Sequence, residues 1–150
     1  MNSLAANLVG TWALQSREDF TPAGERRIDP GLGGDPIALL VFDRAGNFAA
    51  QFMKRDRTSR PAVESSAPAK APPNNSRAQG GYDAYFGTYH VDEKTGIVAT
   101  TLVGALTPEN VGQIFNRAMS VEGDELTIRL ETATPAGEAI VRTLRWKRVG

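Results

Sequence analysis

The sequence contains no cysteine and only one histidine, His90. The absence of cysteine excludes disulfide bonds, thiolate nucleophiles and thiolate metal ligands. Transition-metal sites need several histidine or cysteine ligands, so we expect no metal and no cofactor. A histidine-based catalytic triad lacks support for the same reason, and we interpret His90 as a solvent-facing strand residue.

The chain also has no excess charge of either sign and no long hydrophobic run. Lys plus Arg number 17 and Asp plus Glu number 17, so the net charge is zero and nucleic acid is not an expected partner. Residues 1–14 lack the features of a secretory signal, and no segment reaches the ~18 apolar residues of a membrane span. We therefore expect a cytoplasmic protein without membrane insertion. A mature chain without its signal would look the same, so a periplasmic or secreted location stays open.

What the chain does have is a series of short runs with strand-like residues, separated by glycine-bearing turns. A length of 150 residues suits a single domain, residues 1–150. Residues 3–8 predict one helical turn, and no amphipathic helix of any length follows. The pattern predicts an all-β fold, a single antiparallel up-and-down β-barrel of about eight strands. A β-sandwich is the structural rival, but no Greek-key signal supports it. The expected strands are residues 11–16, 37–42, 48–54, 85–91, 97–103, 111–121, 126–131 and 139–148.

Two long loops interrupt this regular pattern, at about residues 20–36 and about residues 55–81. Long loops inside a compact domain are commonly disordered, plain surface excursions or lids over a site. The composition of the second loop does not choose between these readings. A third hypothesis is that this loop mediates protein–protein contacts or assembly, and a homodimer is possible.

Five segments carry a resemblance to a known family. They read LVGTWALQS from residue 8, LLVFDRAGNFAAQFMKRDR from residue 39, YDAYFGTYHV from residue 82, PENVGQIFNRAMSVEGDELTIRL from residue 108 and TLRWKRV from residue 143. Their order and spacing cover most of the chain except the two long loops. In these segments the chain resembles the bacterial and fungal lipocalin-like domain family.

The resemblance implies a calycin-type barrel with Trp12 plugging its closed end. It also implies that a basic residue of the last strand, Arg148 or Arg145, stacks on this indole, where a guanidinium gains cation–π attraction. Family members often carry histidines in the strand before the Pro108 turn. Thr100 and Thr101 occupy those positions here, so any histidine chemistry of relatives is not expected.

Arg117 is a candidate ligand-binding residue because it interrupts an apolar strand. Strict alternation places it on one face with Phe115 and Met119, which would point it inward. A buried guanidinium can bind a ligand carboxylate or carbonyl through two hydrogen bonds. The alternatives are an internal Asp or Glu partner, or a register that turns Arg117 outward.

Gln51, Phe52, Tyr85 and Tyr89 complete the candidate set. Gln51 would aim its amide into the cavity, unless it is simply the outward residue of an alternating strand. Phe52 and the two tyrosines would line the barrel with apolar bodies and phenolic handles, or would be ordinary core packing. The basic residues of 142–148 suit an outer face, with Leu144 and Trp146 turned in.

These residues predict a protein that binds a small, largely apolar molecule inside the barrel. The alternative is a cofactor-free isomerase or cyclase of a small metabolite, with a tyrosine hydroxyl as acid and Arg117 stabilising negative charge. Both hypotheses use the same cavity and the same side chains. The sequence therefore does not decide whether the protein is an enzyme.

Overall fold

The computed structural model describes residues 3–56 and 80–150. Their elements run in chain order from a short helix through nine strands with one 3-10 helix. The bounds are α1 (Leu4–Leu8), β1 (Gly10–Phe20), β2 (Arg26–Arg27), β3 (Ile37–Phe42), β4 (Asn47–Met53), β5 (Tyr82–Asp92), β6 (Ile97–Ala105), η2 (Pro108–Asn110), β7 (Ile114–Glu122), β8 (Glu125–Ala133) and β9 (Ala139–Arg148).

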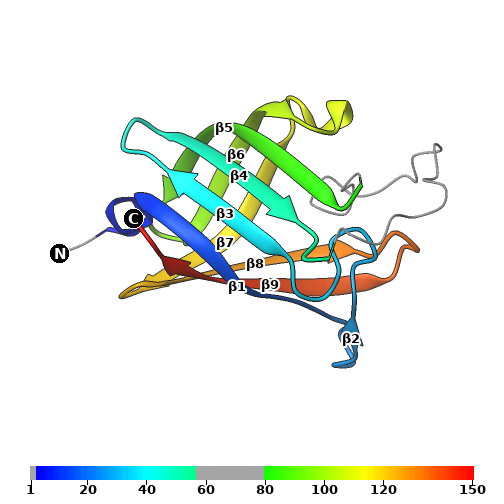
Figure 1. The fold of residues 1–150 in the computed structure, drawn as a ribbon. Coiled ribbons are helices and arrows are strands. Elements are labelled where there is room, and N and C mark those ends of the chain that lie inside the picture. The colour runs from blue at the N-terminus through cyan, green and yellow to red at the C-terminus, as the bar shows by residue number, and fades with distance from the viewer. Residues whose placement is uncertain (1–2, 57–79) are drawn as a thin grey trace.

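The strands form one antiparallel sheet that closes on itself (Figure 1). Its order is β2-β1-β3-β4-β5-β6-β7-β8-β9, and β1 pairs in addition with β9. The barrel wall therefore consists of eight strands, β1 and β3 to β9, with β2 as a short addition at the edge of β1. The predicted all-β, eight-stranded up-and-down barrel with a short N-terminal helix is confirmed.

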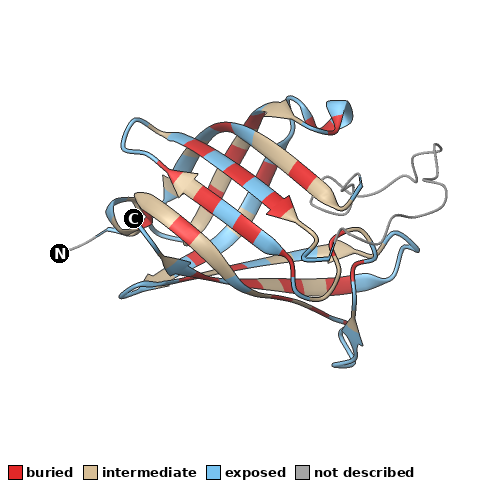
Figure 2. Cartoon of the chain, in the orientation of Figure 1, coloured by how far each residue is buried: buried red, intermediate tan, exposed pale blue. Residues whose placement is uncertain are grey.

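Side chains alternate between the interior and the surface along each strand. In β4, Phe48, Ala50 and Phe52 are buried, whereas the residues between them are exposed. Figure 2 shows this as alternating red and pale blue bands along the strands. Because a strand repeats every two residues, one face of each strand packs into a common core.

Helix α1 and the ends of β1 and β9 close one end of the barrel, at the left of Figure 1. The Trp12 indole N–H donates to the carbonyl oxygen of Leu8 at 2.9 Å. The Arg148 guanidinium lies 4.3 Å from the Trp12 ring and donates to the carbonyl oxygens of Val9 at 2.8 Å and Asn7 at 2.6 Å. Arg148, and not Arg145, is thus the basic residue stacked on Trp12.

Several strands of the wall have other bounds than expected, and β5, for example, begins at Tyr82 instead of residue 85. Strand β1 continues to Phe20 instead of ending at Ser16, because its second half pairs with β9 up to the Phe20–Val141 pair. Strand β7 begins at Ile114 instead of residue 111, because residues 111–113 form the turn that follows the 3-10 helix Pro108–Asn110.

The expected loops also differ in extent from what the structure shows. The first, about residues 20–36, contains β2, which pairs with the end of β1. Most of the second falls on residues 57–79, outside the described residues. No helix within residues 3–56 or 80–150 is long and apolar enough to cross a bilayer.

Two neighbouring strands separate toward the end of the barrel opposite α1. β7 and β8 pair only from Ala118–Arg129 to Glu122–Glu125. The preceding residues of β7, from Ile114 to Arg117, pair with β6 alone. Arg117 is therefore the last residue of β7 before its pairing with β8 begins, which places it at this fork.

Candidate functional site

A cavity of about 40 Å³ lies inside the barrel. A cavity of this size has room for a few water molecules. Its wall is mostly apolar and comes from the inner faces of β3 to β9. The lining residues are Leu40, Phe42, Phe48, Ala50, Phe52, Tyr85, Thr100, Phe115, Arg117, Met119, Ile128, Leu130, Arg142, Leu144 and Trp146.

Aromatic rings from four strands meet around Tyr85. Its ring centroid lies 6.2 Å from that of Phe52 in a stacked arrangement, and 6.1 Å from that of Phe115 in an edge-on one. Phe48 lies 6.0 Å from Tyr85, and Trp146 lies 5.8 Å from Phe52. Such offset and edge-on pairs rigidify an apolar wall, because each ring fixes the orientation of the next.

Arg117 projects from the inner face of β7, on the same side as Phe115 and Met119. Its guanidinium carbon lies 4.6 Å from the centroid of the Phe115 ring. Burial lowers the pKa of the Arg117 guanidinium, Tyr85 raises it, and the nearby charge of Arg142 lowers it further. Among the residues that the structure describes, no carboxylate forms an ion pair with Arg117.

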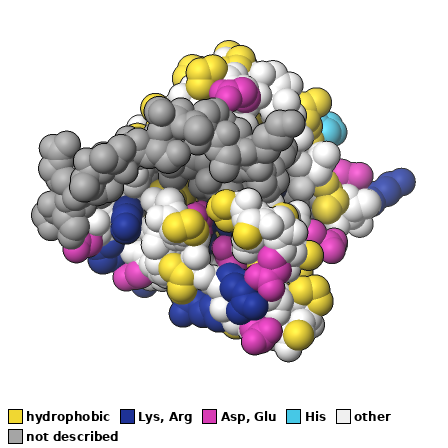
Figure 3. Space-filling model, turned by 90° about the vertical axis from the view of Figure 1, so that its right-hand side faces the viewer, with side chains coloured by type: hydrophobic (Ala, Val, Ile, Leu, Met, Phe, Trp, Pro, Cys, Tyr) yellow, Lys and Arg dark blue, Asp and Glu magenta, His cyan; other side chains and the backbone are white. Residues whose placement is uncertain are grey.

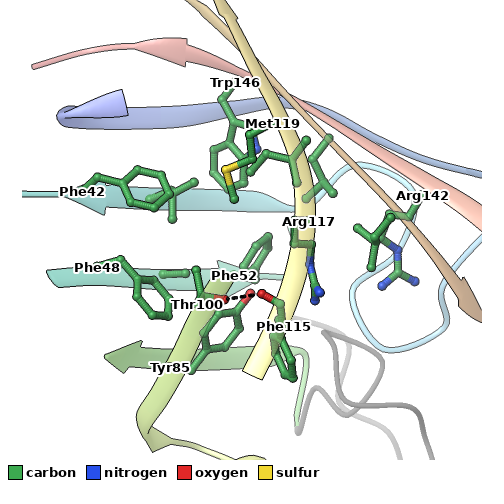
Figure 4. A pocket seen from close by; sticks show the side chains of 15 residues that line it. Phe42, Phe48, Phe52, Tyr85, Thr100, Phe115, Arg117, Met119, Arg142 and Trp146 are labelled. Carbon is green, nitrogen blue, oxygen red and sulfur yellow. Dashed lines mark hydrogen bonds between the residues drawn. The ribbon is translucent and has the colours of Figure 1, made fainter. Parts of the chain in front are cut away.

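Figure 4 shows how these groups are distributed around the cavity. The guanidinium groups of Arg117 and Arg142 lie on one side, and the rings of Phe42, Phe48 and Tyr85 lie on the other. The Thr100 hydroxyl donates to the carbonyl oxygen of Phe115 at 3.3 Å. The cavity is thus polar at one side and apolar at the other.

Two buried ion pairs lie beside this polar side. Arg142 donates to both carboxylate oxygens of Asp19, at 2.8 and 3.0 Å. Arg17 donates to Asp29 at 3.1 Å, and a second contact of 4.0 Å joins Arg142 to Asp29. Burial lowers the pKa of Arg17, as does the charge of Arg142, whereas Asp29 and Asp19 raise it.

Asp83 is the third buried acid of this half of the barrel. One of its carboxylate oxygens accepts from the backbone N–H of Ala84 at 3.0 Å, and the other has no hydrogen-bond partner within the described part of the chain. Burial raises the pKa of Asp83 to about 6, against the lowering effects of the Ala84 hydrogen bond and the Arg17 charge. Asp83 is therefore partly protonated near neutral pH.

The molecule is viewed from this end in Figure 3, where basic and acidic side chains lie side by side on the lower part of the surface. Arg27 and Glu138 form an exposed ion pair, with their closest atoms 2.7 Å apart. The surface at this end therefore carries both signs of charge.

The structure brings five of the seven predicted ligand-binding residues together around the cavity. They are Arg117, Tyr85, Phe52, Phe115 and Met119. Each lies on the inward face of its strand, which is the face that alternation assigns to it.

The predicted inward position of Gln51 is wrong. Gln51 is exposed on the outer surface, because Ala50 and Phe52 on either side of it are buried and successive residues of a strand face opposite ways.

Tyr89 also lies away from the cavity lining. Its hydroxyl donates to the carbonyl oxygen of Asp43 at 2.6 Å, and its ring packs edge-on against Phe42 at 4.8 Å. This hydrogen bond joins β5 to the turn between β3 and β4, so the phenol is engaged at the α1 end of the barrel.

Sequence reasoning missed Arg142, which was assigned to the outer face. Arg142 has the same strand parity as Leu144 and Trp146, and all three are buried. Alternation alone would have identified it. Its partner Asp19 belongs to the part of β1 beyond the expected end at Ser16. The expected strand pattern therefore gave no direction for the Asp19 side chain.

A family model described as a lipocalin-like domain matches residues 9–149. No curated protein matches the chain.

Proposed function

The chain belongs to the family of lipocalin-like domains, and from this premise we propose that it binds a small, largely apolar molecule in the interior of its barrel. The observation that carries the proposal is the interior cavity, with aromatic and aliphatic walls and guanidinium groups on one side. Apolar pockets with a few convergent polar groups are typical of small-molecule sites.

The size of the cavity restricts the ligand. Side chains fill most of the barrel and leave about 40 Å³, whereas sites for drug-sized ligands measure roughly 300–1,000 Å³. A ligand of more than a few atoms must therefore displace side chains. Met119 is suited to this, because its unbranched side chain repacks easily and it lines the cavity. We accordingly expect a compact ligand.

The proposal is tested by filling the cavity. Ala50 is buried and lines the cavity, so Ala50→Leu would place extra carbon atoms in it. Its neighbour Ala49 is exposed on the outer face of the same strand, so Ala49→Leu adds the same atoms outside the barrel. Native mass spectrometry of the protein purified from its own host would detect a bound molecule, and displacement of a fluorescent fatty acid would measure affinity.

We expect binding to the wild type and to Ala49→Leu, and a loss of at least about tenfold in affinity for Ala50→Leu. Overpacking costs Ala50→Leu about 1–3 kcal/mol of stability, so circular dichroism must show that it remains folded. Equal binding by both variants, or no bound molecule in any preparation of folded protein, would refute interior binding.

A further inference from the structure

Among the residues that the structure describes, the buried charges in the open half of the barrel are matched in number but not in position. Two arginines are paired: Arg142 with Asp19 at 2.8 Å, and Arg17 with Asp29 at 3.1 Å. The third arginine, Arg117, lines the same cavity without an acidic partner among the described residues. Asp83, the remaining acid, interacts electrostatically with Arg17 and Asp29.

A guanidinium removed from bulk water requires compensation. An arginine does not deprotonate under ordinary conditions, so it cannot become neutral in response to burial. The contacts of Arg117 are the face of Phe115 at 4.6 Å and the electrostatic influence of Tyr85 and Arg142. The positive charge of Arg142 makes the position less favourable for a second cation. An anion placed in the cavity would offset both the burial of the Arg117 charge and its repulsion by Arg142.

The shape of the Arg117 guanidinium and the apolar lining of the cavity indicate which kind of anion would fit. The guanidinium of Arg117 has five N–H donors in a planar fork, and a carboxylate presents two oxygens that match this fork. Phe42, Phe48 and Tyr85 line the cavity on the side away from the two guanidinium groups. A molecule with a carboxylate at one end and a compact apolar body matches this division.

We propose that the ligand of the barrel interior is a compact carboxylate whose charged group pairs with Arg117 at the fork between β7 and β8. The inference rests on the proposed function, since it specifies the class of molecule that occupies the same cavity. The apolar body then lies against the aromatic wall, and the carboxylate supplies the negative charge that residues 3–56 and 80–150 do not place beside Arg117.

The test compares acids with their neutral amides. Benzoate and butyrate, each paired with benzamide or butyramide, are titrated at pH 7 into wild-type protein, Arg117→Gln, Arg117→Lys and Arg129→Gln, with affinity measured by NMR chemical-shift changes. Arg129 is the matched control, because it is exposed on the neighbouring strand β8. Thermal unfolding verifies that each variant is folded.

We expect the wild type and Arg129→Gln to bind each acid about tenfold or more tightly than its amide, in line with the strength of charge-assisted hydrogen bonds. Arg117→Gln should lose this preference while its affinity for the amides changes by less than about threefold. Arg117→Lys should retain part of the preference, because its point charge lacks the fork.

The outcomes separate this inference from the proposed function. If acids and amides bind equally to the wild type, the carboxylate inference is overturned and interior binding stands. The inference is also overturned if the preference for acids survives both Arg117 substitutions. If neither acids nor amides bind and the protein from its host carries no ligand, both proposals fail.

Discussion

Asp83 is a residue at which burial opposes the charged form of the side chain. It is buried opposite Phe52 of the neighbouring strand, and one of its oxygens accepts no hydrogen bond from the residues that the structure describes. Burial raises the pKa of its carboxyl group from 3.8 to about 6. A shift of about two units corresponds to roughly 3 kcal/mol that favours the protonated form in the folded state.

We therefore predict that Asp83→Asn is more stable than the wild type above pH 6. The folded state binds more protons than the unfolded state between pH 4 and 6, so the wild type loses stability as the pH rises through this range. Asparagine removes the titrating group, and the free energies of unfolding should differ by roughly 1–3 kcal/mol at pH 7.5 and converge near pH 4. Urea unfolding across this range measures the difference.

Asp43→Asn provides a control of opposite sign. Hydrogen bonds from the backbone and side chain of Asn47 lower the pKa of Asp43. Its carboxylate therefore stabilises the fold at neutral pH and loses this effect as the pH falls. A parallel pH dependence for the two variants would contradict the role assigned to the burial of Asp83.

At the scale of elements, the connection between β1 and β3 depends on one buried acid. The backbone N–H groups of Gly31 and Gly33 donate to the side chain and the carbonyl oxygen of Asp29, at 2.8 and 2.7 Å. The other side-chain oxygen of Asp29 accepts from Arg17 on β1. Leu32, from the same connection, is fully buried in the core. Asp29 therefore holds this connection against the barrel.

We predict that Asp29→Ala destabilises the protein by about 3–5 kcal/mol, because it leaves the buried Arg17 charge without its partner. The exposed pair of Asp35 with Arg55, at 3.0 Å, is the comparison, and Asp35→Ala should cost less than about 1 kcal/mol. Denaturant unfolding gives both values. Hydrogen exchange of residues 28–36 should accelerate in Asp29→Ala alone, and equal effects of the two substitutions would argue against this anchoring role.

At the scale of the whole molecule, closure brings the two ends of the chain together (Figure 1). The backbone N–H of Thr11 donates to the carbonyl oxygen of Gly150 at 3.1 Å, and that of Val149 donates to Thr11 at 2.8 Å. Gly10 lies directly beneath this contact, with a φ of +143°. A Cβ there would lie 2.5 Å from an Arg148 guanidinium nitrogen and 2.8 Å from the Gly150 oxygen.

We predict that Gly10→Ala weakens closure and costs about 1–3 kcal/mol, because a φ of +143° is strained for alanine and the methyl group displaces Arg148 or the last residue. Gly123→Ala is the control, since Gly123 also has a positive φ, +60°, but a Cβ there meets nothing within 4 Å. Gly123→Ala should cost less, about 1 kcal/mol. Far-UV circular dichroism and the fluorescence of Trp12 and Trp146 both monitor unfolding. The two signals should give coincident transitions for the wild type, Gly10→Ala and Gly123→Ala, because one barrel unfolds as a unit.

Equal destabilisation by the two alanines would contradict steric contact at Gly10. A fluorescence transition that precedes the circular dichroism transition would instead show that the closed end opens separately.

The sequence by itself determined where the strands lie and which way their side chains point, because both depend on residues that are close together in the chain. A strand repeats every two residues, so the alternation of apolar side chains was sufficient to predict the strands and the inward positions of Arg117, Phe115 and Met119. The same rule, applied consistently, places Gln51 outside and Arg142 inside. The positions of Gln51 and Arg142 were therefore predictable from the alternation of buried and exposed residues along their strands, although both side chains are polar.

Only the tertiary structure decided which side chains meet. Asp19 and Arg142 are 123 residues apart and become an ion pair because β1 pairs with β9. The raised pKa of Asp83 and the lowered pKa of Arg117 depend on how far strands distant in the chain remove each group from water. Alternation gives the direction of a side chain, whereas its partner and its solvation are set by register and closure across the whole barrel.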